Sequence, residues 1–215
     1  MTVLPTASFH LPIELDYLAV CAWALSGALV GLRKRFDLVG VFVTALVSAV
    51  GGGLLRDGLL LQKIPAVLTQ FAYLPLIAAT TALAIALARR LAQAKRIETA
   101  IDIVDSLGTP AFAVVGVEMG VQAGLPWPGA LLVGCVSGVG GGVLRDVLVG
   151  QPPEIMQPGR YLAILVAGAC ALYLTLTLGF GLPRSAAAWG VVAVYFAVRL
   201  ATIRFDWRTR PILPE

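Results

Sequence analysis

Charged residues are scarce in this chain of 215 residues, since only 13% are Asp, Glu, Lys or Arg, whereas 59% are hydrophobic. Soluble domains carry about 25% charged residues. With half that share and a mean hydropathy of +0.89, the chain cannot cover a globular surface with groups that water solvates well. The composition therefore excludes a soluble enzyme. It predicts an integral membrane protein that forms a single transmembrane domain over residues 1–215.

Side chains that carry catalysis or hold metals are also few. The sequence has one histidine, His10, and three cysteines that stand inside apolar runs at none of the spacings of a metal site. We therefore expect no enzyme activity, no cofactor and no fixed metal site. Although the net charge is +4, the basic residues fall in short clusters between apolar runs, which is the pattern of membrane loops and not of a nucleic-acid-binding protein.

Seven apolar runs have about the 17–25 residues that a helix needs to cross a bilayer. They cover residues 13–32, 38–61, 67–88, 103–124, 127–150, 160–179 and 185–203. Lys and Arg accumulate in cytoplasmic loops, and eleven of them stand in alternate segments, against Lys63 and Arg184 in the others. The eleven are Arg33, Lys34, Arg35, Arg89, Arg90, Lys95, Arg96, Arg160, Arg204, Arg208 and Arg210. This bias predicts an outside N-terminus and a cytoplasmic C-terminus.

The chain contains an internal repeat. Residues 50–57, VGGGLLRD, recur as residues 139–146, VGGGVLRD, at a displacement of 89. The same displacement pairs Asp16 with Asp105, Ser48 with Ser137, Gly27 with Gly116 and Gly31 with Gly120. We predict two units, about 13–88 and 103–179, with an extra helix at about 185–203. Because each unit has three spans, the second enters the membrane from the opposite side, which gives a 3+3 inverted repeat.

The two glycine triplets, Gly51, Gly52, Gly53 and Gly140, Gly141, Gly142, allow two interpretations. Small residues let helices approach closely. Alternatively, three consecutive glycines weaken a helix enough to kink or break it, and the exposed carbonyls would line a wet path. We favour the second interpretation, with a transient monovalent cation at each triplet and with Ser48 and Ser137 beside the path.

Arg56 and Arg145 stand at equal distances behind the triplets, within predicted spans. An intramembrane arginine normally faces the bundle interior and pairs with an acid, although one near a helix end can reach the headgroups instead. In the predicted helices Asp16 lies at the same depth in the membrane as Arg56, and Asp105 at the same depth as Arg145. This predicts two ion pairs, Arg56–Asp16 and Arg145–Asp105, one at each mouth of a path. Because adjacent side chains on a helix diverge by about 100°, Asp57 and Asp146 are expected to face elsewhere.

Glu118 has no acidic counterpart in the first unit, where position 29 is a leucine. It is either an acid beside the path, which would attract cations, or a simple interfacial acid. Both interpretations stay open at this point.

These features resemble the prokaryotic trimeric intracellular cation (TRIC) channels, over nearly the whole chain. The resemblance implies a multi-pass protein of a prokaryotic inner membrane, surrounded by membrane lipids. It also implies a homotrimer with one pore per subunit, which conducts potassium, sodium and other monovalent cations, has kinks at both triplets and responds to voltage. We hypothesise that Arg56 or Arg145 blocks the closed path. The same domain is also labelled a glycine transporter, so a secondary transporter for glycine or another small zwitterion is the alternative, and the sequence does not separate the two.

Overall fold

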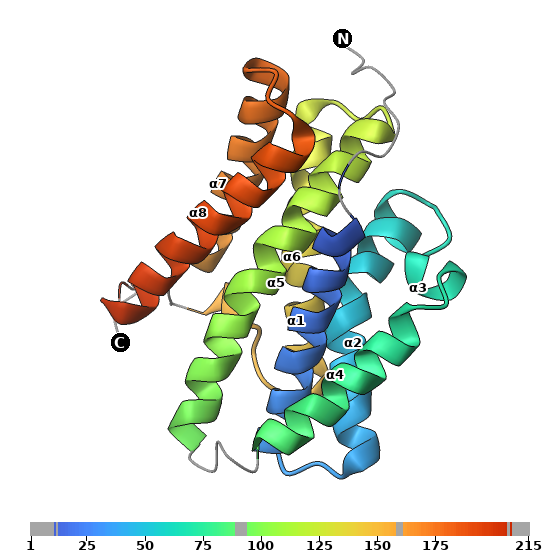
Figure 1. The fold of residues 1–215 in the computed structure, drawn as a ribbon, viewed down its shortest axis with the longest axis vertical. Coiled ribbons are helices and arrows are strands. Elements are labelled where there is room, and N and C mark those ends of the chain that lie inside the picture. The colour runs from blue at the N-terminus through green and yellow to red at the C-terminus, as the bar shows by residue number, and fades with distance from the viewer. Residues whose placement is uncertain (1–10, 12, 89–93, 158–160, 206, 208–215) are drawn as a thin grey trace.

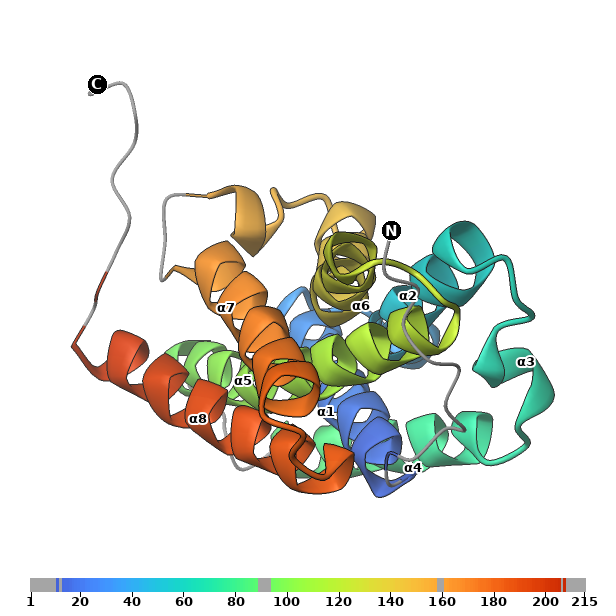
Figure 2. The ribbon, with the colours of Figure 1, turned by 90° about the horizontal axis from the view of Figure 1, so that it is seen from above.

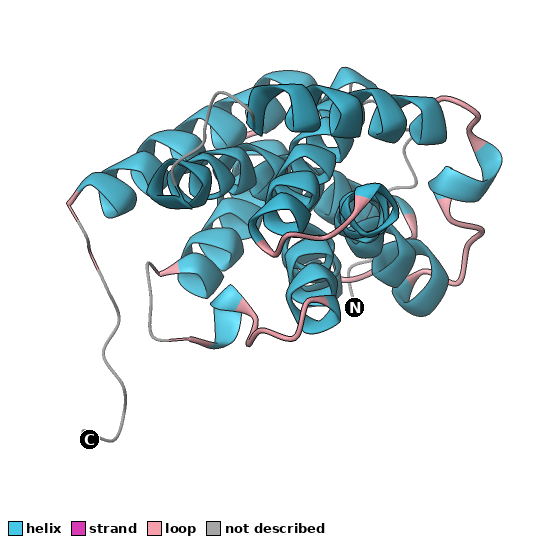
Figure 3. Ribbon diagram, turned by 90° about the horizontal axis from the view of Figure 1, so that it is seen from below, coloured by secondary structure: helices cyan, strands magenta, loops and turns pink. Residues whose placement is uncertain are grey.

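The structure, a computed structural model, describes residues 11, 13–88, 94–157, 161–205 and 207, and these fold into helices joined by short loops (Figure 3). Six helices in this part are long and apolar enough to cross a membrane. They are α1 (Ile13–Arg33), α2 (Leu38–Leu54) with its π-helical continuation η1 (Leu55–Leu60), α5 (Ala94–Gln122), α6 (Trp127–Leu148), α7 (Leu162–Leu174) with η3 (Thr175–Gly179), and α8 (Arg184–Arg204). Of the residues named above, His10, Arg89, Arg90, Arg160, Arg208 and Arg210 lie outside the described part.

The third predicted span is the one that differs most from expectation. It consists of a single turn, α3 (Ala66–Thr69), followed by α4 (Tyr73–Ala88). Gln70 is extended between them, and Pro75 stands in the first turn of α4, where its missing N–H costs no helical hydrogen bond. With 16 residues α4 is about 24 Å long, which is less than the hydrocarbon thickness of about 30 Å. The prediction of one continuous helix over 67–88 is therefore wrong.

The helices form a bundle in which α1 and α5 lie at the centre. Figures 1 and 2 show α7 and α8 on one side of this pair, with α3 and α4 on the other. A short 3₁₀ turn, η2 (Glu154–Met156), connects α6 with α7. The buried side chains of the core are mostly small, such as Ala, Val and Gly, so the central helices approach one another closely.

The two glycine triplets meet where α2 crosses α6. A Cβ atom added to Gly52 would lie 2.2 Å from the carbonyl oxygen of Ser137, and one added to Gly141 would lie 2.2 Å from the carbonyl oxygen of Ser48. Each helix thus presses its backbone against the other with no room for a side chain. Because the contact from the first helix is repeated in reverse from the second, it has the form of a local two-fold relation.

Neither helix breaks at its triplet, since α2 continues through Gly53 to Leu54 and α6 continues through Gly142 to Leu148. The expectation of a helix break with bared carbonyls is therefore wrong, because the α2–α6 contact gives the glycines a packing role. A milder kink at each triplet stays a prediction. The π-helical segment η1 begins only two residues after Gly53.

Candidate functional site

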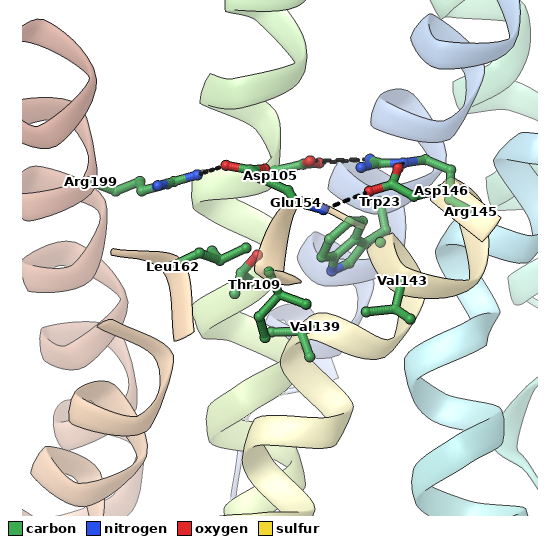
Figure 4. Close-up of a pocket in the computed structure, with 12 residues that line it drawn as sticks. Trp23, Asp105, Thr109, Val139, Val143, Arg145, Asp146, Glu154, Leu162 and Arg199 are labelled. Atoms are coloured by element: carbon green, nitrogen blue, oxygen red, sulfur yellow. Dashed lines mark hydrogen bonds and ion pairs between the residues drawn. The ribbon is translucent and has the colours of Figure 1, made fainter. Parts of the chain in front are cut away.

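Two small cavities lie in the bundle, each beside one of the repeated arginines. The Arg56 cavity is lined by residues that include Asp16, Gly53, Arg56, Asp57, Tyr73 and Phe112. The Arg145 cavity is lined by residues that include Trp23, Asp105, Gly142, Arg145, Asp146, Glu154 and Arg199 (Figure 4). Each has a volume of about 20 Å³, which is room for a single water molecule.

The walls of the two cavities correspond through the 89-residue displacement. Gly53 in one is the counterpart of Gly142 in the other, just as the arginines and aspartates correspond. Phe112, which comes from the second unit, lines the Arg56 cavity, and its counterpart Trp23, from the first unit, lines the Arg145 cavity. Each cavity is thus closed by one aromatic side chain from the opposite half.

The Arg145 cavity holds the ion pair that the sequence predicts. Nη1 of Arg145 donates to Oδ2 of Asp105 at 3.1 Å and also to the hydroxyl of Ser26, while Nε donates to Oδ1 of Asp146 at 2.9 Å. The guanidinium carbon lies 5.6 Å from the centre of the Trp23 ring, within the range of a cation–π contact. The predicted Arg145–Asp105 pair is confirmed.

The Arg56 cavity is bonded differently. The Asp16 carboxylate accepts a hydrogen bond from the hydroxyl of Tyr73, and no ion pair joins it to Arg56 within the described residues. Instead Nε and Nη2 of Arg56 donate to Asp57 at 2.7 and 3.0 Å, and Nη1 has no partner. The predicted Arg56–Asp16 pair is wrong, because Asp16 bonds the hydroxyl of Tyr73 while Arg56 bonds Asp57.

Both aspartates of the repeated Arg-Asp element bond the arginine that precedes them, so the expectation that they face elsewhere is also wrong. An arginine side chain is long enough to turn back onto its neighbour, and the 100° between adjacent side chains does not prevent this. Arg56 and Arg145 are each only 3% exposed. They are therefore interior residues, and neither reaches toward the lipid headgroups.

Carboxylates outnumber arginines in both cavities. The Arg56 cavity has one arginine and two aspartates, and the Arg145 cavity adds Glu154 and Arg199 to the same set. If all these groups are ionised, each cavity carries a formal charge of −1. Buried arginines that are outnumbered in this way do not present a net positive barrier to a cation.

Glu118 lies in neither cavity wall. It is only 1% exposed and accepts hydrogen bonds from Tyr173 of α7 and Gln122 of its own helix, at 3.0 Å each, and from Arg184 of α8. The interpretation as a simple interfacial acid is wrong, because Glu118 is buried and joins α5 to the α7–α8 pair. Its position beside a path stays a prediction. Its partners could not be found from the repeat, since position 29 is a leucine.

Ser48, Ser137 and the first two glycines of each triplet lie in the α2–α6 contact and not in the walls of the two cavities. Both serine hydroxyls are buried without a hydrogen-bond partner. The position of these residues beside a path stays a prediction.

The different bonding of the cavities predicts different energetic coupling. In a double-mutant cycle with Arg145→Gln and Asp105→Asn, we expect a coupling of about 1–3 kcal/mol in the free energy of unfolding. The equivalent cycle with Arg56→Gln and Asp16→Asn should give less, because these two side chains share no bond. Unfolding in detergent would measure both cycles. Equal couplings would contradict the bonding described here.

The sequence of this chain is similar to a known family of membrane proteins. A family model described as glycine transporter matches residues 14–90 and again residues 102–177, one match in each half. A UPF0126 membrane protein of Deinococcus radiodurans is 40% identical over 205 residues, covering 94% of this chain and 92% of the relative. A UPF0126 inner membrane protein of Escherichia coli is 31% identical and covers 89% of this chain and 91% of the relative.

The fold of this chain is also similar to solved structures of TRIC channels. The TRIC channel orthologue from Rhodobacter sphaeroides superposes with a TM-score of 0.82 at 28% identity, over 91% of this chain and 98% of that one. A prokaryotic TRIC channel crystallised in 0.5 M KCl gives a TM-score of 0.82 at 26% identity, over 90% and 96%. The chain belongs to the TRIC-related glycine transporter family.

Several side chains in the cavities of this TRIC-related protein were not singled out from the sequence. Trp23 and Phe112 are 89 residues apart and both aromatic, so extending the repeat register would have found them. Ser26 and Glu154 have no similar residue in the other half. Their roles depend on contacts between helices that no local pattern records.

Proposed function

We propose that this protein is a cation channel with one pore in each subunit, permeable to potassium and sodium. The observation that supports the proposal most is the pair of corresponding Arg-Asp cavities on either side of the α2–α6 crossing. Each places two or more buried carboxylates beside an arginine, and ionisable residues inside a membrane bundle typically mark ion pathways. The relatives with solved structures are described as cation channels.

The proposed channel is a homotrimer in a prokaryotic inner membrane, with its N-terminus outside and its C-terminus in the cytoplasm. The Arg56 cavity then opens toward the outside and the Arg145 cavity toward the cytoplasm, as an inverted repeat requires. The distribution of Lys and Arg in the sequence supports the orientation. The orthologue described as trimeric supports the assembly.

Each cavity has room for one water molecule. On a path that runs through the two cavities, this conformation would be closed to hydrated ions. Opening therefore requires an arginine to leave its carboxylates. Moving one charge across 100 mV is worth about 2.3 kcal/mol, which is enough to make such a movement respond to voltage.

Reconstitution into planar bilayers tests the proposal. We expect unitary currents whose reversal potential follows an imposed potassium gradient and is unaffected by glycine. The family label makes glycine the alternative cargo. Saturable glycine exchange by proteoliposomes, with no unitary current in bilayers from the same preparation, would contradict the channel and establish a transporter. Empty liposomes carried through the same steps are the control.

A further inference from the structure

We infer that Arg199 is a positioning residue that holds the segment after α6, which contains the η2 turn, against the Arg145 cavity. In this way α8 acts as a latch, meaning a contact that keeps the mouth of the path at the Arg145 cavity closed. In the part of the chain that the structure describes, the mouth at the Arg56 cavity has no such latch. The inference builds on the proposed channel, because it concerns how one of its mouths is kept closed. Neither the internal repeat nor the Arg-Asp element includes Arg199, which belongs to the helix outside the two units.

Arg199 is the largest fully buried side chain among the described residues, at 1% exposure. A buried arginine needs an ionic partner, because removing its charge from water costs several kcal/mol that only good bonding offsets. Nη2 of Arg199 donates to Oε1 of Glu154, the first residue of the η2 turn. Both side chains line the Arg145 cavity (Figure 4).

The Arg199–Glu154 pair is continuous with the bonds of the mouth itself. The backbone N–H of Glu154 donates to Oδ2 of Asp146 at 3.2 Å, and Oδ1 of Asp146 accepts from Arg145 at 2.9 Å. Arg145 in turn bonds Asp105 of α5. Figure 4 shows these groups in one line across the cavity. The chain of bonds therefore connects α8, through the η2 turn and α6, to the ion pair on α5.

The first half of the molecule lacks the side-chain part of this arrangement. Pro65 and Pro153 have nearly the same backbone angles and each precedes a short helical turn, so the residue that corresponds to Glu154 is Ala66, which has no carboxylate. There the backbone N–H of Ala66 donates to Asp57 at 3.3 Å. At both mouths a backbone N–H of the following segment bonds the aspartate, but among the described residues only the segment at the Arg145 mouth adds an ion pair, which joins it to α8. This difference assigns the latch to one end of the path.

Hydrogen exchange of the full chain in lipid nanodiscs tests the latch without relying on transport. In Arg199→Gln and Glu154→Gln, we expect peptides covering 151–157 to exchange about tenfold faster, because the Glu154 amide loses the contact that holds its turn in place. Arg199→Lys should stay closer to the wild type, since lysine can still pair with Glu154. The matched control is Arg204→Gln, an exposed residue at the end of the same helix, which should leave the exchange unchanged.

The charge swap Arg199→Glu with Glu154→Arg completes the test. It should restore slow exchange that either single reversal abolishes. Wild-type exchange in both glutamine variants, or equal acceleration in Arg204→Gln, would overturn the latch. If a glutamine variant does not fold, exchange in Arg199→Lys and in the swap decides the question, because both keep a charge pair at the same place.

Bilayer recording of the same proteins separates the latch from the proposed function. We expect Arg199→Gln to spend about tenfold more time open, with the swap returning to the wild-type value. Faster exchange in Arg199→Gln combined with no current in any protein, the wild type included, would refute the channel and leave the latch standing. Altered currents with unchanged exchange would overturn the latch and leave the channel standing.

Discussion

Replacing Gly141 with alanine is expected to lower the free energy of unfolding by about 1–3 kcal/mol or more, although alanine is the better helix former by about 1 kcal/mol. The added Cβ atom would lie 2.2 Å from the carbonyl oxygen of Ser48, far inside contact distance. That oxygen belongs to the backbone of α2 and cannot swing aside as a side chain would. The two helices must therefore move apart along the crossing, and the contacts on both sides of it loosen together.

Gly190→Ala is the matched control. Gly190 also lies within a predicted span, in α8, but a Cβ atom added there meets nothing within 4 Å. This variant should therefore keep or slightly raise the free energy of unfolding. Thermal or detergent unfolding of the two purified variants beside the wild type gives the comparison. Equal stabilities for Gly141→Ala and Gly190→Ala would show that the helices do not touch at the triplets.

Arg145→Ala should raise the fraction of time that the proposed channel is open by about tenfold or more. The substitution removes a guanidinium that binds Ser26, Asp105 and Asp146, and each hydrogen bond to a charged group is worth about 1.5–3 kcal/mol to the state that makes it. It also leaves the carboxylates of Asp105 and Asp146 to attract cations into the mouth. The voltage dependence of opening should weaken, because a charge that moves in the field is lost.

Arg56→Ala provides the internal comparison for Arg145→Ala. Among the described residues Arg56 bonds only Asp57 and leaves Nη1 without a partner, so its removal should change the open fraction less. Single-channel recording at several holding potentials measures both variants under the same conditions. Wild-type opening and voltage dependence in both would remove the arginines from the gating mechanism. A larger effect of Arg56→Ala would reverse the assignment of the main closure.

The sequence predicts where most of the spanning helices lie because the signal for them is local, although α5 begins at Ala94, nine residues before the predicted fourth span. The bounds expected for the first, fifth and seventh spans agree with α1, α6 and α8 to within about two residues. The interrupted third span was not predicted, because hydropathy does not distinguish one long helix from a turn followed by a shorter helix. Pro75 was the available signal, since proline is favoured in the first turn of a helix.

The site was predictable where the repeat carries the information and not elsewhere. Matching depth placed Asp105 beside Arg145 correctly, and the same reasoning failed for Asp16 because Tyr73 competes for it. Arg199 and Glu154 lie 45 residues apart and outside any shared motif. The packing of the bundle brings α8 and the η2 turn together, and no pattern within one helix records that contact.

The reciprocal contact between the triplets also bears on how the two halves of such a duplicated gene can diverge. Gly52 is constrained by a carbonyl in the second half, and Gly141 by a carbonyl in the first. A substitution in either glycine triplet therefore disturbs the packing of both helices. For this reason neither half of the repeat can accumulate mutations freely at its triplet. Trp23 and Phe112, which also correspond through the repeat, differ in type. The eight residues around each triplet are therefore still nearly identical in the two halves, because each triplet packs against the other.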